Sequence, residues 1–193
     1  MKKSSFKTRV MTIVHGKSEY CICSSIKSNL RIKHEIYADK KGAKSIQIDS
    51  LMNVLESTKF NSFRNFTKHF PDVAYHKKRL IDFKLFIIMD LDDCSIEMRN
   101  RYLNKEMFAK HWLYEYIVPI YNDPNLEQTM CEAGVTINKN EKKKYFTVFP
   151  TNHGDLDIEM AQEFLESLKQ CKNSNLAIYV EHCLSLVLSV QQE

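Results

Sequence analysis

The sequence predicts an α/β protein with a mostly parallel central sheet flanked by helices. Near the amino terminus, an apolar run at 10–15 leads through Gly16 into a helical pattern, and a second short strand follows at 34–38. Strands that alternate with helices usually pair in parallel. Farther along, residues 83–89 read FKLFIIM, which is apolar nearly throughout, as expected for a strand that helices cover on both faces.

The first sixty residues contain the signals for these units. Gly16 ends the first strand, and Ser18 is placed to cap a helix from Glu19 to Leu30. Gly42 then turns the chain after the second strand. We expect a brief strand at 45–48 and a helix at 50–56.

Residues 57–81 are expected to form a helical insertion. Phenylalanines recur at helical spacing through it until Pro71 breaks the run. Such a stripe belongs either in the core or, interleaved with bases, on a surface that stacks on nucleobases. On the second interpretation, nucleic acid would contact Lys17, Arg64, Lys68, Lys77, Lys78 and Arg79.

The second half continues the α/β pattern, and we expect one domain over 1–193. Its predicted elements are a helix at 96–103, a strand within 113–121, a helix from Asp123 to Glu132, a charged loop at 139–144, a strand at 145–149 and C-terminal helices at 157–170 and 175–191.

Charge is distributed unevenly along a chain whose formal net charge is +4. Residues 1–81 hold 17 Lys and Arg against 6 Asp and Glu, and residues 82–193 hold 11 against 18. This division suits a positive face beside an acidic pocket, which together can bind a phosphate backbone. The alternative is that the lysines are ordinary solvated side chains.

The cysteines and the amino terminus predict a cytoplasmic protein. The six cysteines contain no C-x-x-C pair, as expected for reduced thiols. The apolar stretch after the basic start ends at His15, which is too short for a signal peptide or a membrane span. We therefore expect no membrane association.

Three aspartates follow the most apolar strand. If the strand continues past its end, Asp90 and Asp92 point to the same side, with Asp93 beside them. Crowded carboxylates are costly unless a cation neutralises them, and Mg²⁺ or Mn²⁺ prefers oxygen ligands. The alternative is that Asp92 or Asp93 caps the next helix, which would explain one aspartate but not three.

The turn from first strand to first helix contains His15, Lys17 and Glu19. Ligands collect at such turns in parallel sheets. Lys17 with Ser18 is suggestive of a phosphate loop, but that motif requires a glycine where Met11 stands, so nucleoside triphosphate binding of this kind is rejected.

These residues resemble the Toprim family, and most closely its OLD and RloB groups of phage-defence nucleases. The segment 16–19 (GKSE) resembles their Gly-x-Thr-Glu turn, Asp90 and Asp92 match their Asp-x-Asp, and 125–127 (NLE) is similar to a later element ending in Glu127. The resemblance spans about 10–132. It implies a Toprim-like, Rossmann-like fold and metal ligation by Glu19, Asp90 and Asp92, and the crowding of the aspartates adds Asp93 as a further metal ligand.

One departure concerns the family's first glutamate, where this chain has His15. The resemblance implies a Mg²⁺- or Mn²⁺-dependent phosphodiesterase acting on DNA or RNA, with His15 handling a proton and Glu19, Asp90 and Asp92 at the centre. Histidine transfers protons and binds transition metals but lacks carboxylate charge. The alternative is therefore a catalytically impaired module that binds nucleic acid or regulates an ATPase partner.

Overall fold

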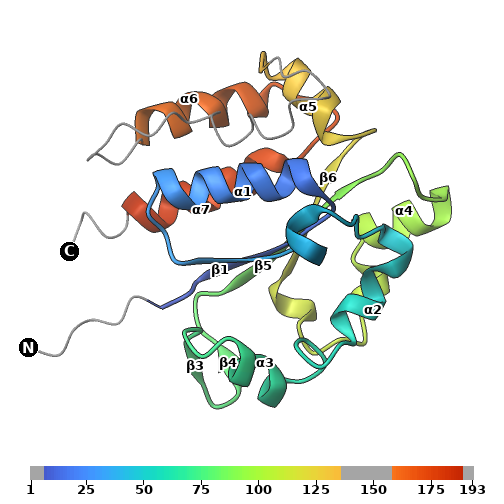
Figure 1. The fold of residues 1–193 in the computed structure, drawn as a ribbon, viewed down its shortest axis with the longest axis vertical. Coiled ribbons are helices and arrows are strands. Elements are labelled where there is room, and N and C mark those ends of the chain that lie inside the picture. Colours follow the sequence, from blue (N-terminus) through green and yellow to red (C-terminus); the bar gives the residue numbers. More distant parts are fainter. Residues whose placement is uncertain (1–6, 136–157, 189–193) are drawn as a thin grey trace, which may run out of the picture.

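Four parallel strands form the central sheet of the computed structural model, which describes residues 7–135 and 158–188. Their order across the sheet is β2-β1-β5-β6 (Figure 1). All three pairings are parallel, with Val10 level with both His34 and Lys84. The bounds are β1 Val10–Val14, β2 His34–Tyr37, β5 Lys84–Asp90 and β6 Ile117–Asn122. The predicted α/β class with a mostly parallel, helix-flanked sheet is confirmed.

Helices cover both faces of this sheet (Figure 1). One face is covered by α1 Lys17–Asn29, α5 Leu126–Glu132 and α7 Leu176–Leu188, and α6 Ile158–Lys169 packs against α7 on the side away from the sheet. The other packs against α2 Leu51–Leu55, α3 Phe63–His69 and α4 Ile96–Leu103. Short 3-10 turns lie between them: η1 Asp39–Gly42, η2 Ile48–Ser50, η3 Glu106–Phe108 and η4 Tyr114–Tyr116.

The two hydrophobic cores divide the strand residues by their alternation. In β1, Val10 and Val14 face the α1 side, whereas Met11 and Ile13 face the α2 side. In β5 every residue after Lys84 is buried, because both faces are covered. This is why the apolar run of the sequence shows no alternation between apolar and polar residues.

The expected helical insertion is helical only in its first part. After α3, the chain forms a small antiparallel hairpin of β3 Tyr75–His76 and β4 Arg79–Leu80. The expectation of a helix up to residue 80 is therefore wrong. Proline interrupts helical hydrogen bonding at Pro71, and two residues with positive φ, Lys77 (46°) and Lys78 (63°), then reverse the chain.

Two of the four phenylalanines in the stripe belong to the core. Phe60 and Phe66 are fully buried, and Phe63 and Phe70 are half-buried. Phe66 lies 5.7 Å from Phe83, measured between ring centres, which places α3 beside the start of β5. Of the two interpretations of this stripe, the structure supports the core for Phe60 and Phe66.

Several element boundaries differ from those expected. Residues 45–48 form no strand but lead into a 3-10 turn, and α1 is capped by Gly16 rather than Ser18. The helix α5 begins after Asn125, whose side chain accepts a hydrogen bond from the Gln128 amide at 3.1 Å. The predicted loop at 139–144 and strand at 145–149 lie outside the described residues.

A short segment before α7 covers the outer edge of β6. Ser174 forms an isolated antiparallel bridge with Asn122, and the Asp123 amide donates to the Asn173 carbonyl at 2.8 Å. The Asn175 side chain accepts a hydrogen bond from the Tyr121 amide at 2.8 Å. These contacts satisfy backbone groups that an edge strand otherwise leaves open, and they connect α7 to the end of β6.

The structure also bears on the cysteines and on membrane-spanning helices. All six cysteines are unpaired, and four of them, Cys21, Cys23, Cys171 and Cys183, are buried. Among the described helices, none combines the length and the apolar character needed to cross a membrane.

Candidate acidic site at the carboxyl edge of the sheet

Five polar residues gather where the parallel strands end. Asp90 is the last residue of β5, Asn122 is the last of β6, and His15 directly follows β1. Glu19 and Glu127 lie in the first turns of α1 and α5. Strand ends and helix starts share one edge in a parallel sheet, which is why residues from 15 to 127 meet here.

Asp90 is the most constrained member of the site. Its side chain is 8% exposed, and its Oδ1 accepts hydrogen bonds from the Leu126 amide at 3.0 Å and the Asn122 side-chain amide at 3.3 Å. Its other oxygen, Oδ2, accepts none from the described residues. One oxygen is thus fixed by the protein, and the second remains available to a ligand.

The electrostatic setting of Asp90 strongly disfavours its ionised form. Burial, together with the negative charges of Glu19 and Glu127, raises the pKa of Asp90 to about 8, against the opposing effects of His15 and the Asn122 hydrogen bond. No lysine or arginine is among the groups that shift this pKa. Asp90 is therefore repelled by two neighbouring carboxylates, and a bound cation would relieve this repulsion.

Glu19 and Glu127 each have a structural contact as well. Glu19 is 3% exposed, and its Oε2 accepts a hydrogen bond from the Gly16 amide at 2.8 Å, which is the glutamate half of a capping box. Glu127 accepts a hydrogen bond from the Ser18 hydroxyl at 3.1 Å. Both acids thus lie in the first turn of a helix, and both also act electrostatically on Asp90.

His15 is held by the segment that follows the 3-10 turn η1. Its Nδ1 lies 3.1 Å from the Ile46 carbonyl, and the Ile46 amide donates to the His15 carbonyl at 2.8 Å. Because a carbonyl only accepts, this contact favours the tautomer with its proton on Nδ1. The Nε2 lone pair is then available to take a proton or bind a metal.

Asn122 was not predicted from the sequence, yet it positions Asp90. Its side-chain oxygen accepts a hydrogen bond from the Ser174 hydroxyl at 3.0 Å, and that hydroxyl accepts one from the Leu176 amide at 3.0 Å. This chain fixes which end of the Asn122 amide faces Asp90. The available signal was its place at the end of the next parallel strand, beside Asp90 in register.

Asp92 and Asp93 are arranged differently from Asp90. The strand ends at Asp90, so the expected alternation does not continue, and both side chains are exposed on a turn. Asp92 accepts a hydrogen bond from the Asn125 side chain at 3.2 Å, and Asp93 accepts one from Gln47 at 3.3 Å. Neither is among the groups that shift the pKa of Asp90, and their ligation of a metal stays a prediction.

A basic loop that sequence reasoning missed lies against the His15–Glu19 turn. A Cβ on Gly42 would fall 2.7 Å from the Gly16 carbonyl oxygen, so the loop carrying Lys40 and Lys41 is packed on the start of α1. Both lysines are exposed and have positive φ, at 47° and 56°. Lys17, which was predicted, begins α1 at the same turn.

The other predicted basic residues lie at the opposite end of the sheet. Arg64 and Lys68 are on α3, and Lys77, Lys78 and Arg79 are on the hairpin that leads into the start of β5. Because β5 runs from Lys84 to Asp90 at about 3.3 Å per residue, this group is about 20 Å from the acids. The structure does not bring these five residues to the acidic site.

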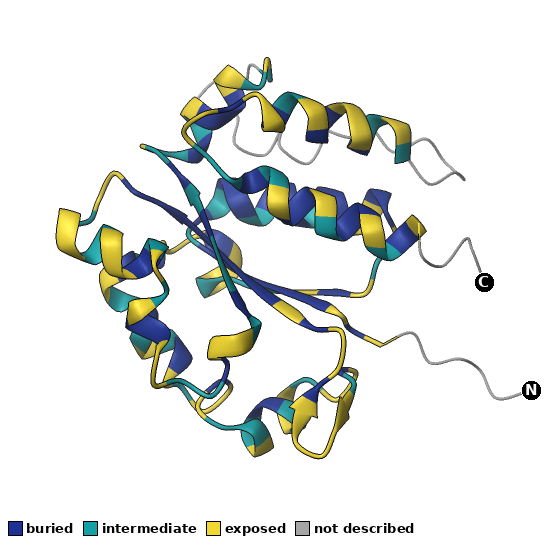
Figure 2. Cartoon of the chain, turned by 180° about the vertical axis from the view of Figure 1, so that it is seen from behind, coloured by how far each residue is buried: buried dark blue, intermediate teal, exposed yellow. Residues whose placement is uncertain are grey.

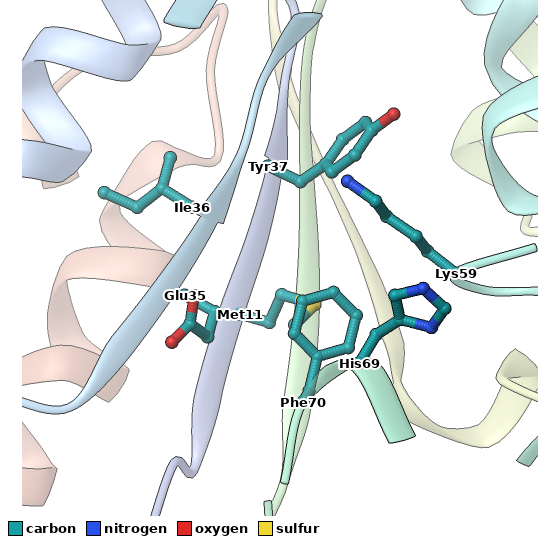
Figure 3. A pocket seen from close by; sticks show the side chains of 7 residues that line it. All are labelled: Met11, Glu35, Ile36, Tyr37, Lys59, His69 and Phe70. Atoms are coloured by element: carbon teal, nitrogen blue, oxygen red, sulfur yellow. The ribbon is translucent and has the colours of Figure 1, made fainter. Parts of the chain in front are cut away.

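A pocket of about 270 Å³ lies beside β2, away from the acids. Figure 3 shows the side chains of Tyr37, Lys59, His69 and Phe70 around it, together with three others from β1 and β2. The amine of Lys59 lies 5.3 Å from the centre of the Tyr37 ring. None of the predicted site residues lines this pocket.

Comparisons with known proteins give no information about this site. No family model, curated protein or solved structure matches this chain. Within residues 7–135 and 158–188, no three His, Cys, Asp or Glu side chains are already arranged as a metal-binding group. The donor set of Asp90, Glu19 and Glu127 is nonetheless composed of carboxylate oxygens, which suits a hard divalent cation.

Proposed function

We propose that this chain is a Toprim-type phosphodiesterase that cleaves nucleic acid with the help of Mg²⁺ or Mn²⁺. The observation that carries the proposal is the meeting of Asp90, Glu19, Glu127 and His15 at the carboxyl edge of a parallel sheet, where burial and the two glutamates raise the pKa of Asp90. The order of these residues along the chain is the order of the resemblance described above.

The residues that would hold a cation are Asp90 and Glu19, with Glu127 beside them. The Oδ2 of Asp90 is the oxygen without a hydrogen bond from the described chain. A bound cation would supply positive charge at the scissile phosphate and lower the pKa of a water molecule. The raised pKa of Asp90 supports this role, because a carboxylate that is costly to ionise alone is stabilised by a cation.

His15 is the residue placed to move a proton. In hydrolysis, water adds to phosphorus, the P–O ester bond breaks, and a base must take one proton from the water. The contact between His15 Nδ1 and Ile46 leaves Nε2 as that base. Lys17 and the packed loop of Lys40 and Lys41 are cations at the same turn that can contact the phosphates.

The second candidate is a module that binds nucleic acid, or regulates an ATPase partner, without cleavage. It is favoured by the capping contact of Glu19 and by the Ser18–Glu127 hydrogen bond, since both acids already have structural partners. In this case the chain would lack catalysis because it has His15 where the Toprim family has its first glutamate. Defence against phage and a cytoplasmic location are part of the family-based proposal for either candidate.

Cleavage of labelled single-stranded RNA and DNA in Mg²⁺ or Mn²⁺ tests the proposal. We expect Asp90→Asn to lose at least about 100-fold in rate, because it removes the central carboxylate while keeping its shape. The matched control is Asp82→Asn, an exposed aspartate just before β5 at the opposite end of the sheet, which should change the rate much less. Equal rates for the native chain and Asp90→Asn would contradict the proposal.

A substitution at His15 separates the two candidates. If His15 is the base, His15→Gln slows cleavage, because glutamine cannot take the proton. If the native chain binds but never cleaves, and His15→Glu begins to cleave in Mg²⁺, the binding module is the correct candidate and the missing acid is identified.

A further inference from the structure

The end of the sheet opposite the acids carries a dense group of uncompensated cations. Residues 59–84 hold seven Lys and Arg against two acids, Asp72 and Asp82. Asp72 is already paired with Lys33 at 2.9 Å. Five cations of this segment are exposed and make no ion pair in the described part of the chain: Arg64, Lys68, Lys77, Lys78 and Arg79.

The fold brings these cations onto one surface, which we call the amino-end surface. The rings of Phe63 on α3 and Tyr75 on β3 pack edge to face with centres 5.1 Å apart, so the helix and the hairpin are neighbours. Figure 1 shows α3, β3 and β4 side by side, and Figure 2 shows much of this region as exposed. Tyr75 is itself 53% exposed, which places an aromatic side chain among the cations.

The hairpin turn keeps its lysines at a conformational cost. Lys77 and Lys78 both have positive φ in a two-residue turn, where Asn-Gly is the favoured pair. A left-handed residue with a side chain costs about 1 kcal/mol or more relative to glycine. The hairpin turn therefore carries two positive charges at positions where Asn-Gly would be more stable.

The pocket beside β2 adjoins the same helix. His69, which follows Lys68 at the end of α3, lines the pocket with the half-buried rings of Tyr37 and Phe70. Lys59 stands over the Tyr37 ring, and Glu35 is the one acid among the lining residues. At about 270 Å³, the pocket has room for a flat ring rather than for a larger ligand.

From this arrangement we infer that the amino-end surface binds single-stranded nucleic acid. The cations contact phosphates, and an unpaired base enters the pocket against Tyr37, His69 and Phe70. Rings that stack on bases beside a positive track are the usual way to hold a single strand, whereas the bases of a duplex are not free to enter a pocket. The inference does not require the acidic site, because the two lie about 20 Å apart along β5.

A charge variant tests the phosphate contacts with a 20-nucleotide single strand at pH 8, in EDTA so that no cleavage occurs. We expect Lys77→Asn/Lys78→Gly to bind more weakly and to reduce the slope of log K against log salt by about 1.4, since each phosphate contact on a single strand contributes about 0.7. This variant installs the favoured turn pair, so misfolding does not account for lost binding. The matched control is Lys110→Gln/Lys172→Gln, two exposed lysines elsewhere.

A pocket variant tests the base contact independently. We expect His69→Ala to reduce affinity about five-fold or more without changing the salt slope, because it removes a stacking ring rather than a phosphate contact. The inference is overturned if the control variant changes the slope as much as the hairpin variant does. It is also overturned if a duplex of equal length or polyglutamate binds as tightly as the single strand, or if His69→Ala binds normally.

These results stand apart from the nuclease proposal. If Asp90→Asn abolishes cleavage and the hairpin variant binds normally, the acidic site survives and the amino-end surface fails. If no cleavage is found but the hairpin and pocket variants lose binding as described, the nuclease proposal fails and the amino-end surface is supported.

Discussion

The two ends of the central sheet handle charge in opposite ways. At the carboxyl edge, Asp90 and Glu19 are nearly inaccessible and are held by backbone amides and side chains. At the amino end, the cations of α3 and the hairpin are exposed and make no ion pairs in the part of the chain described. Buried charge costs folding free energy, whereas exposed charge costs little.

This difference indicates how each end was built. At the carboxyl edge, the side chains are oriented by a hydrogen-bond chain that runs from Asp90 through Asn122 and Ser174 to the start of α7, which gives the fixed geometry that the proposed catalysis needs. At the amino end, the nucleic-acid binding that we infer needs only a positive field and accessible rings. We therefore expect substitutions at the carboxyl edge to change stability, and substitutions at the amino end to change binding with little effect on stability.

The largest expected effect on stability is at Asp90. Its pKa is about 8 in the folded protein and near 3.8 in the unfolded chain, so the folded state binds the proton more tightly. The stability that this proton contributes is complete below the unfolded pKa and is lost as pH rises through the folded pKa, by up to about 1.4 kcal/mol per pH unit. In EDTA, Asp90→Asn should therefore be more stable than the native chain at pH 8, and the difference should shrink toward pH 4.

Denaturant unfolding at several pH values measures this prediction. Asp92→Asn serves as the control, because Asp92 is exposed and its substitution should change stability little. A constant difference between Asp90→Asn and the native chain from pH 4 to pH 8 would show that Asp90 is not held in a costly environment.

The next largest loss of stability is expected at Gly42, where the basic loop packs closely against the start of α1. Alanine there would place a Cβ 2.7 Å from the Gly16 carbonyl at a φ of +80°. We expect Gly42→Ala to lose about 2–4 kcal/mol of stability from clash and backbone strain together. Gly134→Ala is a matched control, because its φ of +76° is similar but nothing lies within 4 Å of the added Cβ. Equal losses at the two glycines would refute close packing of the loop.

A smaller effect is expected at Asn122. Asn122→Ala removes the donor to Asp90 and the acceptor of the Ser174 hydroxyl in a fully buried position, which should cost about 1–3 kcal/mol. The loss should be greater above pH 8, where ionised Asp90 needs that donor most. Asn173→Ala, an exposed asparagine nearby, should lose much less in the same denaturant titration. An unchanged unfolding midpoint for Asn122→Ala would show that Asn122 does not hold Asp90 in place.

The smallest effect is at the hairpin turn. Lys77→Asn/Lys78→Gly should gain up to about 1 kcal/mol, because the new pair adopts positive φ more readily. Thermal unfolding measures the gain. A large loss would mean that the lysines contribute to folding, and the contrast between the two ends of the sheet would then be weaker than proposed.

Much of the fold was predictable because its strongest signals are local. The run at 83–89 could only be a strand covered on both faces, and β1, α1 and α4 were placed within a few residues. The hairpin at 75–80 was not predicted, because its two-residue turn consists of lysines rather than the usual Asn-Gly. The start of α5 was also misplaced. The sequence predicts a helix from Asp123, because Asp-Pro is typical of a helix start, but Asn125 is the capping residue.

The candidate site was predictable in part for the same reason. Asp90 and Glu19 adjoin strong local signals, a buried strand and a helix start, and the structure places both in one electrostatic environment. The turn carrying Asp92 and Asp93 depended on where the strand stops, which is decided by the bonds of the Leu91 amide to the Asn122 and Pro124 carbonyls. Those bonds are tertiary and leave no sequence signal.

The sequence by itself determined which segments are strands and helices and which residues carry charge, because apolar periodicity and capping act over a few residues. Only the tertiary structure decided which charges meet. The parallel order of β1, β5 and β6 brings His15, Asp90 and Asn122 to one edge, and the packing of α3 on the hairpin gathers the cations at the other. Strand order and helix packing depend on contacts between distant residues, whose partners no local pattern specifies.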